Sequence, residues 1–215
     1  MKRVLITAGP THEAIDAVRY IANRSSGRMG IAIAEAARDA GWDVTLLLGP
    51  VCTSPPEHVR VERFTSTDDL ARLLDANFPT CEVLIMAAAV ADYLPANPAQ
   101  DKLPRNSEGL RLELVPTPDL VQLCARKRQS HQRIVGFALE EPESLDARAM
   151  QKLRTKQLDA IVANPLGTMD SECIAAKIFT PDARTHWPVH AGTINKLSFA
   201  KWLVGWIETE LALDR

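Results

Sequence analysis

The chain has 215 residues, of which 46% are hydrophobic and 24% are charged, a composition typical of a globular protein with one sizeable core. Its formal net charge of -2, from 25 basic and 27 acidic residues, argues against nucleic acid or an anionic membrane surface as a partner. Because the sequence has neither a signal peptide nor a run of about 18 apolar residues, we expect a single cytoplasmic domain over residues 1–215 without a membrane span.

The first half of the chain predicts alternating strands and helices. Short, apolar, β-prone runs predict four strands, at residues 4–7, 43–48, 59–64 and 83–86. Between the first two, residues 29–40 carry small apolar side chains and stop at Gly41, which is typical of a helix packed closely on a sheet. Residues 67–69 cap a second helix. Strands that are apolar throughout are buried on both faces, which favours an α/β fold with a doubly wound, mostly parallel, Rossmann-like sheet.

A proline-rich stretch then interrupts the alternation. Residues 94–118 contain five prolines, and we expect approximately residues 94–109 to form a mobile active-site flap. Residues 110–115 alternate between apolar and polar side chains, which predicts a half-exposed strand. Further elements are predicted as helices at residues 119–128 and 144–156, strands at residues 133–137 and 159–162, and an amphipathic closing helix at residues 194–213.

The four cysteines are widely spaced and form no Cys-x-x-Cys pair, so the sequence predicts neither a zinc site nor a disulfide framework. We expect no metal bound by protein side chains alone. The simplest prediction is that all four are buried free thiols, at Cys52, Cys81, Cys124 and Cys173.

In a doubly wound sheet, ligands bind beyond the carboxyl ends of the strands, so the loops after the predicted strands are the place to look for a site. The first loop has only Gly9 where a classical dinucleotide site has Gly-x-Gly-x-x-Gly, which argues against a plain dehydrogenase. Residues 23–30 read NRSSGRMG at a helix start, where backbone donors could bind a phosphate or carboxylate. The same residues also fit a simple helix N-cap.

Three motifs, in one order along the chain, resemble those of the phosphopantothenoylcysteine synthetases. The first, at residues 9–30, reads GPTHEAIDAVRYIANRSSGRMG. The second, at residues 87–95, reads AAAVADYLP and is followed by Lys102. The third comprises VGFA at residues 135–138, then Lys152, Lys156 and the run IVAN at residues 161–164. Together they cover nearly the whole chain.

The resemblance implies an amide ligase of coenzyme A biosynthesis that works in two steps. The carboxylate of phosphopantothenate attacks the α-phosphate of CTP, or of ATP in some members, and pyrophosphate leaves. The amine of cysteine then displaces the nucleoside monophosphate. Both steps develop charge on oxygen, so cations, amide donors and Mg²⁺ bound with the nucleotide are required, whereas no flavin is expected. The resemblance also implies a homodimer, with residues 110–115 as a candidate pairing edge.

The resemblance also assigns roles to individual residues. The nucleotide is assigned to Met86, Ala87, Ala88, Asp92, Lys102, Pro118, Asp119, Leu120, Val121, Phe137, Lys152 and Lys156. The substrate is assigned to Arg19, Asn23, Ser25, Ser26, Gly27 and Ala89. Lys102 and Asn23 are the catalytic candidates, Lys102 for attack on the α-phosphate and Asn23 for attack by cysteine. Without the resemblance, Lys152 and Lys156 would fit a solvated basic helix face, and Phe137 a core aromatic residue.

Two other functional classes fit the predicted fold. An NAD(P)-dependent oxidoreductase is disfavoured by the missing glycine fingerprint and by the lack of a Tyr-x-x-x-Lys pair. A non-catalytic nucleotide-binding regulator is disfavoured because the motif lysines and Asn23 are retained. Because the chain begins at its own first strand, we expect a monofunctional synthetase whose product passes to a separate decarboxylase. One departure from the family is the flap, where KLPR at residues 102–105 replaces the common Lys-x-Lys-Lys.

Overall fold

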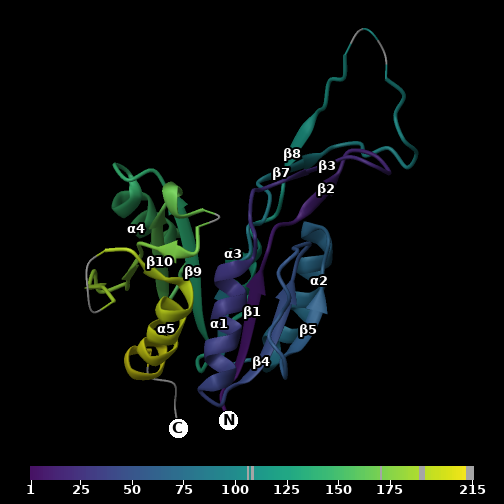
Figure 1. Ribbon diagram of the computed structural model, residues 1–215. Helices are drawn as coiled ribbons and strands as arrows, with labels where there is room; N and C mark the ends of the chain where they lie inside the picture. Colours follow the sequence, from purple (N-terminus) through teal and green to yellow (C-terminus); the bar gives the residue numbers. More distant parts are fainter. Residues whose placement is uncertain (106, 108, 170, 189–191, 212–215) are drawn as a thin grey trace.

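The computed structural model describes residues 1–105, 107, 109–169, 171–188 and 192–211. Six parallel strands form most of its central sheet: β1 (Arg3–Ala8), β4 (Asp43–Leu48), β5 (Arg60–Arg63), β6 (Val83–Met86), β9 (Arg133–Glu140) and β10 (Ala160–Pro165). Two antiparallel strands, β12 (Lys177–Phe179) and β13 (Thr185–His186), extend one edge. The order across the sheet is β13-β12-β10-β9-β6-β1-β4-β5 (Figure 1). The parallel strands alone thus follow the order 3-2-1-4-5-6 of the classical nucleotide-binding sheet.

Helices cover both faces of this sheet. On one face lie α1 (Arg28–Asp39) and α5 (Lys196–Glu210), and on the other lie α2 (Thr67–Asn77), α3 (Leu120–Lys127) and α4 (Leu145–Thr155). Side chains along β1 alternate between the two cores, with Val4 and Ile6 on the α1 side and Leu5 on the α2 side. The inner parallel strands are therefore largely buried on both faces, as their apolar runs predicted, whereas the edge strand β5 is exposed or only partly buried along its length. Among the described residues, no helix is both long and apolar enough to cross a membrane.

A glycine brings the start of α1 close to the end of β1. A Cβ atom on Gly30 would lie 2.5 Å from the Cβ of Ala8 and 3.0 Å from the carbonyl oxygen of Thr7. Any larger residue would therefore push the helix away from the strand. The close approach places the first turn of α1 directly at the carboxyl end of β1.

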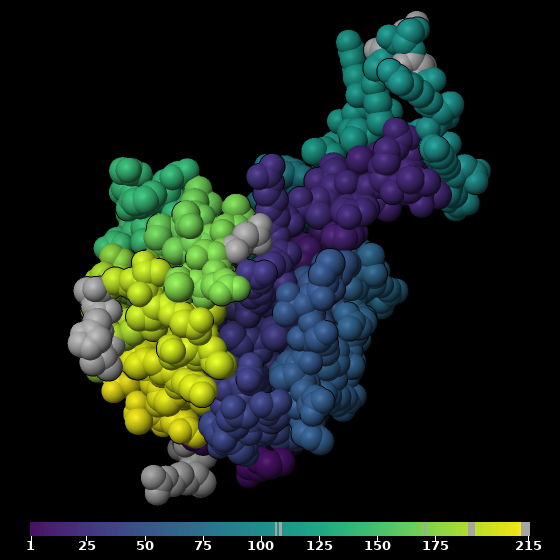
Figure 2. All heavy atoms as spheres, viewed as in Figure 1, coloured from purple at the N-terminus to yellow at the C-terminus, as the bar shows by residue number. Residues whose placement is uncertain are grey.

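Two short β-hairpins project from the sheet as an arm, formed by residues 12–22 and the described part of residues 93–116. The first pairs β2 (His12–Ala14) with β3 (Tyr20–Ala22), and the second pairs β7 (Tyr93–Pro95) with β8 (Leu114–Pro116). The hairpins are joined by a hydrogen bond from Ala99 N to the Ile15 carbonyl oxygen at 3.0 Å. The arm leaves the body on the side away from α4 (Figures 1 and 2).

The prediction of a strand over residues 110–115 is wrong in its first part. Strand β8 begins only at Leu114, because β7 has three residues and the hairpin's last backbone hydrogen bond runs from Ala96 N to the Glu113 carbonyl oxygen at 2.9 Å. Leu110 and Leu112 precede it and are exposed. The predicted flap over residues 94–109 begins inside strand β7, so its first two residues belong to a strand. Residues 106 and 108 of the predicted flap lie outside the described residues.

Several short elements were not predicted from the sequence. They are the hairpin β2–β3, the edge strands β12 and β13, the pair β11 (Cys173–Ile174) and β14 (Ile194–Asn195), and the 3-10 helices η1 (Phe78–Thr80) and η2 (Leu166–Thr168). The closing helix starts later than predicted, because Asn195 is its N-cap and accepts a hydrogen bond from Leu197 N at 2.8 Å. Residues 212 and 213 of the predicted helix lie outside the described residues.

The cysteine prediction holds for two of the four positions. All four are free thiols, and Cys81 and Cys124 are buried as expected. Burial raises the pKa of both thiols to about 12, so they stay protonated and unreactive. Cys52 is instead exposed, and Cys173 is only partly buried. Neither of these two therefore belongs to the core.

Candidate active site

A cavity of about 810 Å³ lies at the carboxyl ends of the parallel strands. Its walls come from the segment before α1, the turn after β6, the start of α3, the end of β9, the end of α4 and the segment after β10. The strand order reverses between β1 and β6, and crevices at such reversals are where open α/β sheets bind ligands. The cavity is large enough for a nucleotide or a molecule of similar size.

All but two of the residues predicted for the site line this cavity. They are Asn23, Ser25, Ser26, Gly27, Met86, Ala87, Ala88, Ala89, Asp92, Pro118, Asp119, Leu120, Val121, Phe137, Lys152 and Lys156. The exceptions are Arg19 and Lys102, which lie on the arm.

The first turn of α1 faces the cavity without a side-chain cap. Its N-cap is Gly27, which has a left-handed φ of 71° and no side chain that could accept from the helix. Ser25 Oγ accepts a hydrogen bond from Gly27 N at 3.4 Å and does not cap the helix. The interpretation of the Ser-Ser pair as an N-cap is therefore wrong. Backbone donors and the positive end of the helix dipole are positioned to hold an anion here.

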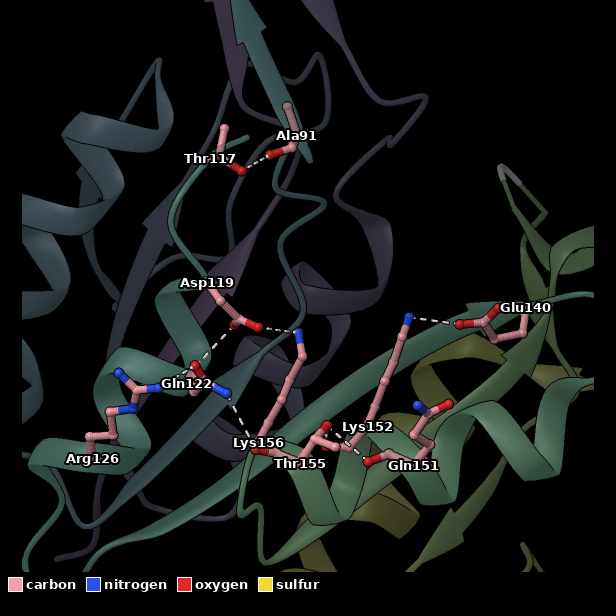
Figure 3. Close-up of polar contacts among 10 residues, drawn as sticks. All are labelled: Ala91, Thr117, Asp119, Gln122, Arg126, Glu140, Gln151, Lys152, Thr155 and Lys156. Carbon is pink, nitrogen blue, oxygen red and sulfur yellow. Dashed lines mark hydrogen bonds and ion pairs between the residues drawn. The ribbon is translucent and has the colours of Figure 1, made fainter. Parts of the chain in front are cut away.

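Threonine side chains fix the small-residue turn after β6. Thr7 Oγ1 accepts from Ala88 N at 3.0 Å, and Thr11 Oγ1 accepts from Ala91 N at 3.0 Å. From the other side, Thr117 Oγ1 donates to the Ala91 carbonyl oxygen at 2.5 Å (Figure 3). The turn is thus rigid, and its alanine side chains leave room for a ligand to approach the backbone.

Asn23 is a further anchor of the same turn. Its Nδ2 donates to the carbonyl oxygens of Ala89 at 3.3 Å and Val90 at 2.9 Å. The sequence prediction gave this amide the role of donor to an oxyanion. In the structure its two donor hydrogens are directed at backbone carbonyls, so its immediate effect is to hold the turn.

Two lysines at the end of α4 point into the cavity and are each paired with a carboxylate (Figure 3). Lys152 Nζ lies 2.7 Å from Glu140 Oε1, and Lys156 Nζ lies 2.9 Å from Asp119 Oδ2. The Glu140 side chain is only 8% exposed and also contacts Arg148 Nη1 at 3.3 Å. Both lysines therefore line the cavity while each is paired with a carboxylate, which differs from a solvated basic face.

The acidic groups of the cavity could accompany a metal ion but do not form a metal site of their own. Asp92 lines the cavity, and its carboxylate makes no hydrogen bond or ion pair with a described residue. Within the described part of the chain there is no cluster of three or more metal-ligating side chains. One carboxylate beside a triphosphate is the usual way in which proteins hold Mg²⁺ with a nucleotide.

Arg19 and Lys102 lie together on the arm. Arg19 pairs with Asp16, and its Nη2 donates to the Leu103 carbonyl oxygen at 2.9 Å. Lys102 is the neighbouring residue and is exposed. Figure 1 shows the hairpin that carries Arg19 far from α4, whose lysines line the cavity. Arg19 and Lys102 therefore lie on the arm and outside the lining of the cavity of their own chain.

Sequence reasoning missed several other residues that line the cavity, namely Arg24, Arg28, Asn164, Thr168 and Lys196. Arg24 and Arg28 flank the Ser-Ser-Gly motif, so their position was a usable signal. Asn164 ends the run at residues 161–164, and its Nδ2 donates to Thr168 Oγ1 at 2.8 Å. Lys196 begins α5, and no pattern around it indicated a site.

Comparisons with known proteins agree on one family. The sequence profile of the DNA/pantothenate metabolism flavoprotein C-terminal domain matches residues 1–211. The coenzyme A biosynthesis bifunctional protein CoaBC of Vibrio vulnificus (strain YJ016) is 36% identical over 196 residues, which cover 88% of this chain and 49% of that protein. A cysteine/cysteine sulfinic acid decarboxylase from an unknown prokaryotic organism is 42% identical over 166 residues, which cover 77% of this chain and 46% of that protein.

Among solved structures, the crystal structure of the C-terminal domain of a CoaBC protein superposes with a TM-score of 0.82 at 34% identity. The match covers 99% of this chain and 97% of that domain. The chain spans about half the length of the curated relatives and nearly all of the solved domain. The similarity therefore concerns one domain of the longer proteins.

Proposed function

The chain belongs to the family of the DNA/pantothenate metabolism flavoprotein C-terminal domain, and from this membership we propose that it joins phosphopantothenate to L-cysteine through an acyl-nucleotide intermediate. The observation that carries the proposal is that 16 of the 18 residues assigned by motif line one cavity. That cavity combines an uncapped helix N-terminus with two lysines, the groups that a triphosphate and a second anion require.

In the first step, a carboxylate oxygen of phosphopantothenate forms a bond to the α-phosphorus of the nucleotide while the bond to pyrophosphate breaks. Lys152 and Lys156 hold the triphosphate, and Lys102 neutralises the charge that develops on the transferring and leaving groups. The turn at residues 86–88 supports the nucleotide, and Phe137 packs near its base. Mg²⁺ bound with the nucleotide would neutralise phosphate charge, and Asp92 would supply its protein carboxylate.

In the second step, the amine of cysteine forms a bond to the acyl carbon, loses a proton and expels the nucleoside monophosphate. Asn23 and the turn that it anchors hold the acyl group in line with the amine. Ser25, Ser26 and Gly27 lie at the start of α1, where backbone donors would bind an anionic part of the substrate. Neither step transfers electrons, so the proposed reaction needs no flavin.

The strand order 3-2-1-4-5-6 and the two helical layers support the description of the fold as a doubly wound, Rossmann-like sheet. We propose that the whole chain acts as one ligase domain, with the proline-rich part of the arm as its flap. Because the flap carries Lys102, the arm must bring Lys102 to the cavity of its own chain or of a second copy before the first step can occur.

The test of the proposed function is pyrophosphate release in magnesium buffer. We expect release only when phosphopantothenate and a nucleoside triphosphate are both present, and nucleoside monophosphate only after cysteine is added. Comparing the four nucleoside triphosphates identifies the preferred base. Turnover of NADH without pyrophosphate would support an oxidoreductase, and nucleotide binding without any turnover would support a regulator.

The two cavity lysines give a first prediction. Lys152→Ala and Lys156→Ala should each raise the nucleotide KM by about 10- to 100-fold, because a charge-assisted contact contributes roughly 1.5–3 kcal/mol. Arg154→Ala is the matched control, since Arg154 is an exposed cation on the same helix that does not line the cavity. Steady-state kinetics with varied nucleotide measures the effect. Unchanged KM values in both lysine variants would mean that the triphosphate lies elsewhere.

We further propose a homodimer in which the arm of one subunit completes the cavity of the other. Neither Arg19 nor Lys102 lines the cavity of its own chain, and the arm exposes large apolar side chains that a partner would cover. These side chains are Val18, Tyr20, Tyr93, Leu110, Leu112 and Leu114. The candidate pairing edge is residues 110–115, and the exposure of Leu110, Leu112 and Leu114 supports this proposal.

A mixed dimer tests this arrangement. Lys102→Gln damages the arm and Asn23→Asp damages the cavity, so a dimer with one chain of each kind contains one intact site if arms act on the partner. Co-expression in equal amounts should then restore about one quarter of the native rate, because about half of the dimers are mixed and each has one working site of two. If the arm serves its own cavity, the mixed sample stays as slow as the single variants.

A further inference from the structure

The arm contains a fully buried carboxylate, Asp16, which the proposed mechanism does not use. Its side chain is 0% exposed. Oδ1 accepts hydrogen bonds from Val18 N at 2.9 Å and from Arg19 N at 2.8 Å. Oδ2 accepts from Arg19 Nε at 2.9 Å, from Arg19 Nη2, and from Leu103 N at 3.1 Å. The carboxylate therefore joins the hairpin that contains it to a residue 87 positions further along the chain.

The contact with Leu103 has two parts. Asp16 accepts from the amide of Leu103, and Arg19 Nη2, oriented by Asp16, donates to the carbonyl oxygen of the same residue at 2.9 Å. Both backbone polar groups of Leu103 are thus held by one ion pair. A third hydrogen bond, from Ala99 N to the Ile15 carbonyl oxygen at 3.0 Å, secures the segment on the other side of Lys102.

Lys102 lies between these anchors and is itself exposed. Its ammonium makes no hydrogen bond or ion pair with any residue that the structure describes. The direction in which this side chain leaves the arm is consequently set by the backbone on either side of it. On the side of Leu103, two hydrogen bonds hold this backbone. A lysine without partners of its own depends on such support to reach a fixed position.

The Asp16–Arg19 pair favours the charged form of both groups. The hydrogen bonds from Arg19 hold the pKa of Asp16 well below its usual range, and the pairing raises the pKa of Arg19. Both groups therefore stay charged through the whole range in which the protein would work. Two-point contact between a guanidinium and a carboxylate also fixes the orientation of the guanidinium, which a lysine could not reproduce.

Resting on the proposed function, we propose that Asp16 is a positioning residue for Lys102, acting through Arg19 and the backbone of Leu103. Asp16 links Arg19 to the backbone beside Lys102, so that the arm presents these two cations at a set spacing. The alternative is that Asp16 only stabilises the hairpin loop at residues 15–19, through its bonds to Val18 and Arg19. The two roles differ in whether the effect of Asp16 depends on Lys102.

The experiment is a double-mutant cycle with Asp16→Asn and Lys102→Gln. The asparagine keeps the size of the side chain and one acceptor for the loop, but it loses the charge and one of the oxygens. We expect Asp16→Asn to lower kcat for pyrophosphate release by about 10- to 100-fold, with nucleotide KM changed less than about 2-fold, as for loss of an aligned electrostatic group. In the Lys102→Gln background the same substitution should cost less than about 3-fold.

Glu13→Gln is the matched control. Glu13 is a buried carboxylate on the same hairpin, but it accepts from Thr67 N at 3.0 Å and Thr67 Oγ1 at 2.6 Å and has no contact with Leu103. Its effect on the rate should be the same with and without Lys102. If Asp16→Asn does not fold, Asp16→Glu replaces it, since that change keeps the charge but displaces the carboxylate from the amide of Leu103.

The outcomes separate this inference from the proposed function. If the native chain releases no pyrophosphate with nucleotide and phosphopantothenate, the proposed function fails. If the native chain is active and Asp16→Asn either keeps the full rate or lowers it equally in both backgrounds, Asp16 is only a structural residue of the loop. A loss that disappears when Lys102 is already absent supports the positioning role.

Discussion

Lys102→Gln should release pyrophosphate about 10²- to 10³-fold more slowly than the native chain, as expected for the loss of one electrostatic contact in a closed site. Glutamine has nearly the length of lysine and retains hydrogen-bond donors, so the substitution removes mainly the positive charge. Because Lys152 and Lys156 supply the ground-state contacts to the triphosphate, the nucleotide KM should change little. The loss should appear in the first step, before cysteine takes part.

The measurement is a rapid-quench experiment without cysteine that follows pyrophosphate in a single turnover. Lys201→Gln is the control, because Lys201 is an exposed lysine on α5 outside the cavity. A Lys102→Gln chain that forms pyrophosphate at the native rate and slows only after cysteine is added would remove Lys102 from the first step.

Asn23→Asp should leave the first step working and block the second, which is the opposite of the effect expected for Lys102→Gln. We expect one burst of pyrophosphate per site, followed by a stall with the acyl-nucleotide bound. The new carboxylate would lie against the carbonyl oxygens of Ala89 and Val90, where the native amide donates hydrogen bonds. Repulsion would displace this part of the turn, whereas Ala88, which supports the nucleotide, is still held by Thr7. Release of nucleoside monophosphate should fall by about 10²- to 10³-fold.

The experiment follows pyrophosphate and nucleoside monophosphate separately after cysteine is added to the preformed intermediate. Asn164→Asp is the matched control, because it also replaces a cavity amide by a carboxylate but lies at the end of β10, away from the turn. Equal loss of both products in Asn23→Asp, without trapped acyl-nucleotide, would contradict the assignment of Asn23 to the second step.

The sheet and its helices could be predicted from the sequence because each depends on local pattern. The strands at residues 43–48 and 83–86 have the bounds that their apolar runs gave, since strands buried on both faces need apolar side chains throughout. The two antiparallel strands at one edge of the sheet could not be predicted from the sequence, because β12 and β13 are too short to show a periodic pattern of apolar and polar residues.

The arm could not be predicted for a different reason. Strands β2 and β3 have three residues each, and they are stabilised by contacts with residues 93–116, far away in the sequence. No local alternation marks such strands, so no strand was predicted within residues 12–22. Residues 110–112 alternate between apolar and polar side chains as a strand should, but no strand of the described residues pairs with them. Pattern alone cannot supply a pairing partner.

The candidate site, too, could be predicted only as far as it depends on local pattern and topology. Strand ends and motifs located the cavity and most of its lining, because the rule for parallel sheets depends only on topology. The ion pairs of Lys152 with Glu140 and of Lys156 with Asp119 were not predicted, although both lysines and Asp119 were predicted for the site. Which carboxylate meets which lysine depends on the relative placement of β9, α3 and α4, and this is a tertiary property.

In the proposed reaction, those two ion pairs would also affect how fast products leave. An incoming triphosphate must displace Glu140 and Asp119 from the lysines, so the carboxylates act as internal competitors and part of the attraction between lysine and phosphate is offset (Figure 3). When pyrophosphate departs, each ammonium regains a counter-ion within the protein and is not left unpaired in a half-buried site. The pairs thus weaken the hold on product as well as substrate, which favours turnover over tight binding.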